Sequence, residues 1–181
     1  MTTSPAATAT TTTPTLEERL FALLGAQDAI TVGTAESCTG GNVAHHITRI
    51  AGSSAYFLGG IVSYANSVKH GVLGVPEDVL RNPGAVSAPC AIAMAEGARR
   101  VLGTTLAVST TGIAGPGGAT AFKPVGLVYL AIAGDGLETQ VEEHRFSGDR
   151  EAVIAASTTR ALELLVDAAS RLIANAETGR T

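Results

Sequence analysis

The sequence contains little cysteine, and this excludes two common ways of stabilising a small protein. Its two cysteines, Cys38 and Cys90, are far apart in the chain and form no C-x-x-C pair. A disulfide framework or a zinc site requires more such residues at closer spacing. Each cysteine therefore fits the role of a small, reduced residue in the core.

Long apolar runs and clusters of basic residues are also absent. No apolar run reaches the roughly 18 residues needed to cross a bilayer, and residues 1–15 lack the charged start and apolar centre of a signal peptide. The formal net charge is −4, and the 12 basic residues are scattered along the chain. This distribution gives no electrostatic footprint for nucleic acid. We therefore expect a cytoplasmic protein without a membrane or nucleic-acid partner.

The histidines do not form a recognisable metal site. His45 and His46 are adjacent, so on a helix they point about 100° apart, and His70 and His144 have no partner at ligand spacing. We expect neither a metal nor another cofactor.

The composition fits one domain preceded by a tail. With 181 residues, 45% of them hydrophobic, the chain suffices for a single compact domain with an apolar core. Residues 1–14 are almost all Thr, Ala, Ser and Pro, which bury too little apolar surface to offset the entropy of ordering. We expect a disordered tail over 1–14 and one domain over 15–181.

Apolar periodicity after the tail predicts helices that alternate with strands. Helices are expected at 16–24, 40–50, 66–73, 88–102 and from about 149 onward, and strands at 30–35, 58–64, 106–109, 126–133 and 138–146. Thr15 and Glu18 match a capping box, and Asn66 and Ser87 match N-caps. A G-D-G turn makes the last two strands an antiparallel hairpin. We predict a three-layer α/β domain, with a mixed, mostly parallel β-sheet that contains this hairpin and is flanked by helices.

The motif T-A-E-S-C-T-G-G (34–41) follows an apolar strand and opens a helix. A strand that leads directly into a helix projects side chains above the sheet edge, and the N–H groups of the first helical turn point outward. Such a turn suits a nucleophile, here Ser37, and the N–H groups near Thr39 and Gly40 suit an oxyanion or a phosphate. The same pattern also arises where Ser37 or Thr39 only caps the helix.

Lysine is rare in this chain, and its positions are informative. Lys69 and Lys123 are the two lysines among the 12 basic residues. A lysine whose pKa is lowered by burial acts as the general base in Ser–Lys variants of serine catalysis, so Lys69 is a candidate base for Ser37. Tyr64, five residues before Lys69, is placed to relay the proton or to hold the pair. The alternative is a surface lysine beside a core tyrosine.

Residues 112–124 form a predicted glycine-rich loop after a strand. Glycine permits close approach of backbone to a ligand, although a plain surface loop has the same composition. The motifs G-x-G-x-x-G, G-x-x-x-x-G-K-[ST] and G-x-S-x-G are absent. The standard dinucleotide, P-loop and α/β-hydrolase signatures are therefore missing.

Seven blocks together resemble the nicotinamide-nucleotide amidohydrolases, a family also known as the competence-damage-inducible protein C-terminal domain. The blocks are T-A-E-S-C-T-G-G (34–41), I-A-G-S-S-A-Y-F (50–57), G-G-I-V-S-Y-A-N-S-V-K (59–69), G-A-V-S (84–87), T-G-I-A-G-P-G-G (111–118), K-P-V-G (123–126) and F-S-G-D-R (146–150). They extend over nearly the whole chain after the tail, in the same order as in the family. The chain resembles the stand-alone form of this domain.

The resemblance implies hydrolysis of the carboxamide of nicotinamide mononucleotide to nicotinate mononucleotide and ammonia, in pyridine-nucleotide recycling. It places the nucleophile at Ser37 and the assisting residues at Lys69 and Tyr64. The residues expected to contact substrate come from the matching motifs: Glu36, Thr39, Gly40, Gly41, Thr111, Gly112, Gly115, Lys123 and Arg150. Arg150 suits either a substrate phosphate or an ion pair with Asp149.

A non-catalytic nucleotide-binding module is the alternative function. In that case the turn and the glycine-rich loop hold a phosphate, and Ser37 only caps a helix; the fold alone does not separate the two functions. Lys69 together with Ser37 favours the enzyme, because a phosphate site needs no buried base. The expected partners are a small nucleotide substrate and further copies of the chain in a symmetric homo-oligomer.

Overall fold

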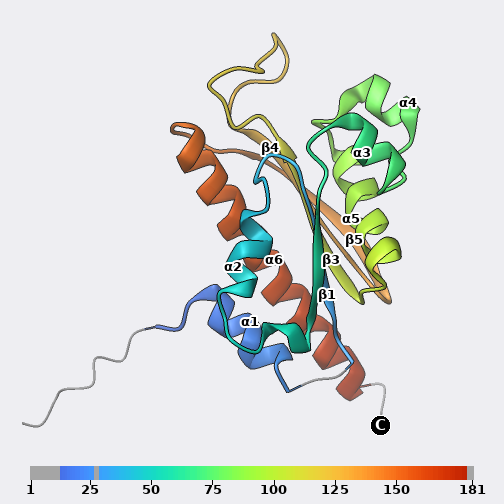
Figure 1. Cartoon of the computed structure of the whole chain (residues 1–181), viewed down its shortest axis with the longest axis vertical. Helices are drawn as coiled ribbons and strands as arrows, with labels where there is room; N and C mark the ends of the chain where they lie inside the picture. The colour runs from blue at the N-terminus through green and yellow to red at the C-terminus, as the bar shows by residue number, and fades with distance from the viewer. Residues whose placement is uncertain (1–12, 27–28, 179–181) are drawn as a thin grey trace, which may run out of the picture.

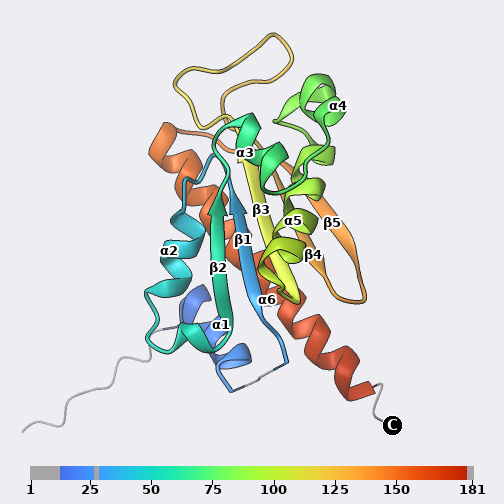
Figure 2. The same ribbon diagram turned by 45° about the vertical axis from the view of Figure 1, so that its right-hand side comes forward.

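A five-stranded mixed sheet forms the middle layer of the protein, whose structure is a computed structural model describing residues 13–26 and 29–178. The strands are β1 (Val32–Glu36), β2 (Phe57–Val62), β3 (Leu106–Gly112), β4 (Leu127–Gly134) and β5 (Leu137–Arg145). They lie in the order β2-β1-β3-β4-β5 (Figure 2). Strand β1 pairs in parallel with β2 and β3, whereas β4 is antiparallel to both β3 and β5. Strand β5 therefore runs in the direction of β1, β2 and β3, and the predicted mixed, mostly parallel sheet is confirmed.

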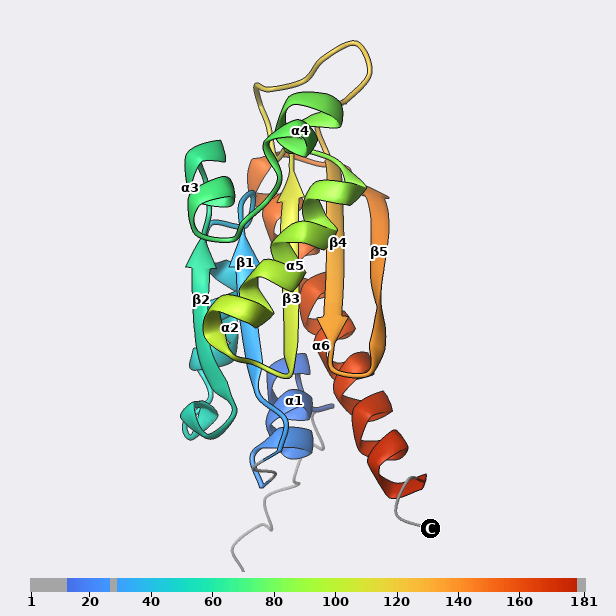
Figure 3. The same ribbon diagram turned by 90° about the vertical axis from the view of Figure 1, so that its right-hand side faces the viewer.

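Helices cover both faces of this sheet (Figure 1). One face carries α1 (Leu16–Leu24), α2 (Asn42–Thr48) and α6 (Arg150–Thr178), and the other carries α5 (Ala88–Leu102), which lies across the sheet in Figure 3. The shorter elements are η1 (Ser53–Ala55), α3 (Asn66–Gly71), α4 (Glu77–Val79) and η2 (Leu80–Gly84). Along β4, Val128 and Leu130 face the first group of helices, whereas Ala131 and Ala133 lie in the cluster beneath α5. This alternation gives the predicted three layers.

The predicted boundaries of α1 and α5 are confirmed by their caps, whereas α2 and α3 are shorter than the predicted 40–50 and 66–73. Thr15 and Glu18 form the complete capping box at the start of α1. The Ser87 hydroxyl accepts from the Cys90 N–H at the start of α5, and Gly103, in the left-handed region with φ 67°, follows its end. These local signals act through hydrogen bonds that the helix ends cannot make for themselves.

Two local predictions are wrong. Asn66 does not cap α3, because the helix already includes Asn66 and its N-cap, Ala65, makes no side-chain cap bond. Strand β3 continues past the predicted end at Ser109 to Gly112. Its polar end stays in the sheet because it pairs with β4, and the Thr111 hydroxyl donates to the carbonyl of Ala85 at 2.7 Å.

Of the tail expected at 1–14, residues 1–12 lie outside the described part of the chain. None of the described helices is long and apolar enough to span a membrane. Cys38 and Cys90 are both buried and free, as predicted.

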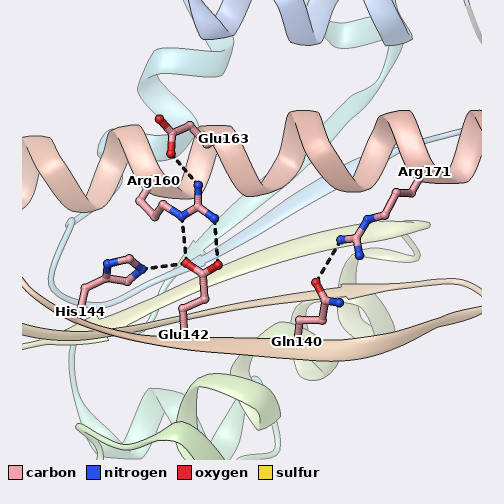
Figure 4. A network of polar contacts seen from close by, with 6 residues as sticks. All are labelled: Gln140, Glu142, His144, Arg160, Glu163 and Arg171. Atoms are coloured by element: carbon pink, nitrogen blue, oxygen red, sulfur yellow. Dashed lines mark hydrogen bonds and ion pairs between the residues drawn. The ribbon is translucent and has the colours of Figure 1, made fainter.

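Opposite charges link β5 to α6 (Figure 4). Arg160 donates to both carboxylate oxygens of Glu142 at 2.8 Å and to Glu163 at 2.6 Å, and the His144 ring lies 2.7 Å from Glu142. These four residues are termed the Arg160 network. Hydrogen bonding from Arg160 holds the pKa of Glu142 at about 2.

The carboxyl ends of β1, β2 and β3 meet at one edge of the sheet (Figure 2). The loop between β3 and β4, residues 113–126, projects from the same edge. Segments from three separate parts of the chain therefore converge where ligands bind most often in open α/β sheets.

Candidate active site

Ser37 and Lys69 meet at this edge. Ser37 follows the last residue of β1, and Lys69 lies in α3, just after β2. Lys69 Nζ lies 2.9 Å from Ser37 Oγ, although 32 residues separate the two in sequence. Lys69 is only 1% exposed, so the alternative of a surface lysine is wrong.

The partners of Lys69 are electrically neutral. Besides the Ser37 hydroxyl, its Nζ donates to the backbone carbonyls of Ser63 at 2.6 Å and Tyr64 at 3.3 Å. No carboxylate of the described residues pairs with it. Burial lowers the pKa of Lys69 because it penalises the charged ammonium. A neutral amine can keep both carbonyl contacts and turn its lone pair toward the serine hydroxyl.

A cavity of about 270 Å³ opens beside this pair. Seven of the predicted site residues line it: Ser37, Tyr64, Lys69, Thr111, Gly112, Gly115 and Arg150. The structure therefore brings together the predicted nucleophile, the predicted base, the glycine-rich loop and one cation.

Tyr64 contacts the site differently from the expectation. Tyr64 is 61% exposed, and its hydroxyl accepts from Arg150 Nη2 at 3.2 Å, whereas its carbonyl faces Lys69. The alternative of a core tyrosine is therefore wrong, and the hydroxyl contact favours a holding role over a proton relay. Arg150 also donates to the Gly115 carbonyl at 2.8 Å, while Asp149 accepts from the Ala152 N–H. Among the described residues, no ion pair joins Arg150 to Asp149.

Glu36 caps α2 instead of lining the cavity. Glu36 is 1% exposed, and its carboxylate accepts from the backbone N–H groups of Gly41, Val43 and Ala44 at 2.9–3.0 Å. The alternative in which Ser37 or Thr39 only caps this helix is therefore wrong. The carboxylate of Glu36, at the end of β1, therefore occupies the place at the start of α2 where an anion would otherwise bind.

The neighbouring N–H groups and hydroxyls are also used within the protein. The Gly40 N–H donates to the Ser37 carbonyl at 3.2 Å, and the Gly41 N–H donates to Glu36. Thr39 is 3% exposed, and its hydroxyl donates to Glu36 at 2.7 Å. The Gly40 and Gly41 N–H groups, which lie where an oxyanion or phosphate site was predicted, therefore already have acceptors within the protein.

Lys123, which was predicted to contact substrate, does not line the cavity, whereas Asn66 does. Lys123 donates to the carbonyl of Pro83 at 2.7 Å and is not among the residues that line the cavity. Asn66, which we did not predict as a site residue, lines the cavity beside Tyr64 and Lys69. Its position between those two residues in the block S-Y-A-N-S-V-K was the available signal.

Cys38 lies on the cavity wall next to Ser37, and Cys90 lies in α5. Burial raises the pKa of both thiols to about 11, so both stay protonated at neutral pH. Within residues 13–26 and 29–178, no cluster of three or more His, Cys, Asp or Glu side chains could hold a metal ion. The nucleophile that the geometry offers is therefore the Ser37 hydroxyl.

Comparison with known proteins identifies the same family along the sequence and in three dimensions. A family model described as the CinA C-terminal domain matches residues 13–169. A CinA-like protein of Geobacter sulfurreducens is 50% identical over 154 residues, which cover 85% of this chain and 36% of the relative. A putative competence-damage inducible protein of Moorella thermoacetica is also 50% identical, covering 83% and 36%. The chain thus spans about a third of the length of these curated relatives.

Solved structures match the chain over most of their own length. The competence/damage inducible protein CihA of Agrobacterium tumefaciens has a TM-score of 0.79 and 41% identity, covering 84% of this chain and 94% of that one. A CinA superfamily protein of Klebsiella pneumoniae has a TM-score of 0.81 and 33% identity, covering 86% and 96%. The similarity in sequence and the similarity in fold therefore indicate the same family.

Proposed function

This chain belongs to the CinA C-terminal domain family, and from that premise we propose that it is a nicotinamide-nucleotide amidase. It would hydrolyse the carboxamide of nicotinamide mononucleotide to nicotinate mononucleotide and ammonia. The observation that carries the proposal is the 2.9 Å contact between Lys69 Nζ and Ser37 Oγ, made by a lysine that is 1% exposed and has only neutral acceptors.

The proposed reaction has two halves with Lys69 as the proton carrier. The neutral amine takes the proton of Ser37 as Oγ attacks the carboxamide carbon, and a tetrahedral oxyanion forms. Collapse breaks the C–N bond, and the departing nitrogen takes the proton from Lys69 and leaves as ammonia. Water then attacks the ester on Ser37 and gives a proton to Lys69, which returns it to Oγ as nicotinate mononucleotide leaves.

The cavity supports a nucleotide of modest size. Its volume of about 270 Å³ lies just below the range of roughly 300–1,000 Å³ that is typical of small-molecule sites. Arg150 supplies a guanidinium on the cavity wall, which suits a phosphate. Thr111, Gly112 and Gly115 form the adjoining wall, where backbone can approach the ligand closely. We assign the phosphate end of the substrate to Arg150 and the carboxamide end to Ser37.

The non-catalytic alternative explains less of the site. A phosphate-binding module has no use for a buried lysine in contact with a serine hydroxyl, because burying an ammonium without a carboxylate costs free energy. The first turn of α2, which such a module would use, is already occupied by Glu36.

Ammonia release from nicotinamide mononucleotide tests the proposal. Purified protein is expected to release ammonia and nicotinate mononucleotide in equal amounts, and Ser37→Ala is expected to abolish both while still binding the nucleotide. Nicotinamide itself serves as a control substrate that lacks the phosphate. Binding without hydrolysis by the wild-type protein would instead support the binding module.

We further propose that the protein acts in the cytoplasm as a symmetric homo-oligomer. The edge strand β2 exposes Leu58 and Val62, each about half exposed, and it offers unpaired backbone groups to a neighbour. Light scattering is expected to give a multiple of the 18.2 kDa chain mass. The mass of a single chain at micromolar concentration would contradict this part of the proposal.

A further inference from the structure

We infer that Glu36 is a positioning residue for Ser37: by binding the first turn of α2, its carboxylate fixes the turn that holds the serine against Lys69. The inference rests on the proposed function, because it takes Ser37 as the nucleophile. It assigns Glu36 a role other than the substrate contact expected from its motif.

The Glu36 carboxylate is fully engaged within the protein. Three of its hydrogen bonds come from backbone N–H groups of α2 and the residue before it. Two more come from the hydroxyls of Thr34 at 3.2 Å and Thr39 at 2.7 Å. Both oxygens accept from at least one backbone N–H, so the group is held at both ends. A buried carboxylate with this many donors has a structural role, because it has no free acceptor for a substrate.

The same turn leaves Ser37 dependent on this anchor. The backbone before the serine is held by β2 and β3: the Ser63 N–H donates to the Glu36 carbonyl at 2.8 Å, and the Ser37 N–H donates to the Thr110 carbonyl at 2.9 Å. The backbone after it passes through Gly40 and Gly41, with φ 64° and 102°. Two consecutive glycines in the left-handed region have many other accessible conformations, so they do not fix the turn themselves.

A second contact ties the turn to the sheet. Because the Thr39 hydroxyl donates to Glu36, the Thr110 hydroxyl, 2.7 Å from it, must donate to Thr39. This chain of hydrogen bonds runs from β3 through Thr39 to the carboxylate and on to α2. Without the carboxylate, several buried donors lose their acceptor, and the segment that carries Ser37 loses its link to α2. A displacement of about 1 Å at a reacting atom costs about 100-fold in rate.

Glu36 acts on Ser37 through position and leaves the ionisation of Lys69 to burial. Its five donors are backbone N–H groups and threonine hydroxyls, and Lys69 is not among them. Burial is the main cause of the lowered pKa of Lys69. Removing the carboxylate should therefore lower turnover and leave the pH midpoint of kcat/KM where it is in the wild type.

Glu36→Gln is the primary test, because the amide keeps the size of the side chain but has one acceptor oxygen in place of two. We expect kcat on nicotinamide mononucleotide to fall about tenfold or more, with KM within about twofold of the wild type. The rate at which phenylmethanesulfonyl fluoride labels Ser37, followed by mass spectrometry, should fall in parallel. Thr15→Ala is the matched control, since it removes a helix cap from α1 and should lower the melting temperature without changing kcat.

The outcomes separate this inference from the proposed function. A wild-type protein that neither hydrolyses the nucleotide nor is labelled at Ser37 would overturn the proposed function. An active wild type with a Glu36→Gln variant of normal kcat and labelling rate, or with a shifted pH midpoint as its sole defect, would overturn the positioning role. If Glu36→Gln does not fold, Thr39→Val decides: it removes one of the five hydrogen bonds, and normal kcat in that variant would overturn the inference.

Discussion

Lys69 and Arg160 are both held inside networks of polar contacts, but their partners differ in charge. Lys69 contacts a hydroxyl and two carbonyls, whereas Arg160 binds Glu142 through two nitrogens and Glu163 through a third (Figure 4). Burial lowers the pKa of Lys69, while hydrogen bonding to the carboxylates raises the pKa of Arg160. The Arg160 network fixes charge and links β5 to α6. The site around Lys69 leaves one cation free to lose its proton.

Among the variants considered, Lys69→Arg should cause the largest loss of turnover. Lys69→Arg keeps a positive charge but cannot give up a proton, so turnover should fall by about 100- to 10,000-fold, the usual contribution of a general base. Steady-state ammonia release measures the loss. The double variant with Ser37→Ala should lose little more than either single variant, because the two groups act as one unit. Near-normal turnover in Lys69→Arg would remove Lys69 as the base.

The pH dependence of kcat/KM should follow the protonation of Lys69. Only the neutral amine accepts the Ser37 proton, so activity should rise as pH rises through the lowered pKa and then level off. A set of overlapping buffers at constant ionic strength measures the profile. Activity that falls over the same pH range, or that does not change, would break the link between burial and catalysis.

The free energy of unfolding should also depend on the protonation of Lys69. The folded pKa of Lys69 lies below the unfolded value of about 10.4, so between these two values the unfolded chain binds more protons, and stability rises with pH. Lys69→Met has no proton to lose there. Urea denaturation should show the wild type gaining stability relative to Lys69→Met as pH rises toward about 10.4. A constant difference between the two proteins would contradict the lowered pKa.

The smallest effect is expected in the Arg160 network. The Glu142 side chain is 33% exposed, so Glu142→Gln should lower the free energy of unfolding by only about 1 kcal/mol at neutral pH. The folded pKa of about 2 lies below the unfolded value, so the contribution of Glu142 is present above about 4.3 and is lost as pH falls toward 2. Turnover should not change. A loss of activity in Glu142→Gln would show that the Arg160 network is coupled to the site around Lys69.

Much of the fold was predictable because its signals are local. The capping box at Thr15, the cap at Ser87 and the glycine after α5 each act on neighbouring backbone groups, and the hairpin turn is equally local. The extension of β3 to Gly112 was not predictable in the same way. Its polar residues belong in a strand only because β4 pairs with them, and that pairing joins distant parts of the chain.

In the candidate site, too, the local features were predictable and the contacts between distant residues were not. Ser37 and Lys69 could be singled out because one lies in a strand-to-helix turn and the other is one of two lysines. The role of Glu36 could not, because an acidic residue before a nucleophile is compatible with substrate contact and with helix capping. The choice depends on whether its side chain points to the cavity or back over α2, and only the folded turn determines that. Likewise, the contact of Lys123 with Pro83 joins two loops that sequence spacing does not relate.

The scarcity of lysine allows a direct measurement of whether Lys69 has the lowered pKa that a general base requires. Because Lys69 and Lys123 are the two lysines of the chain, protein labelled with ¹³C and ¹⁵N lysine should show two side-chain signals by NMR, and Lys123→Arg assigns them. We predict that the Lys69 signal titrates clearly below the ordinary lysine value of about 10.4 and at the same pH as the rise in kcat/KM. A Lys69 signal that titrates at or above that value, in protein that hydrolyses the nucleotide at neutral pH, would contradict its role as the base.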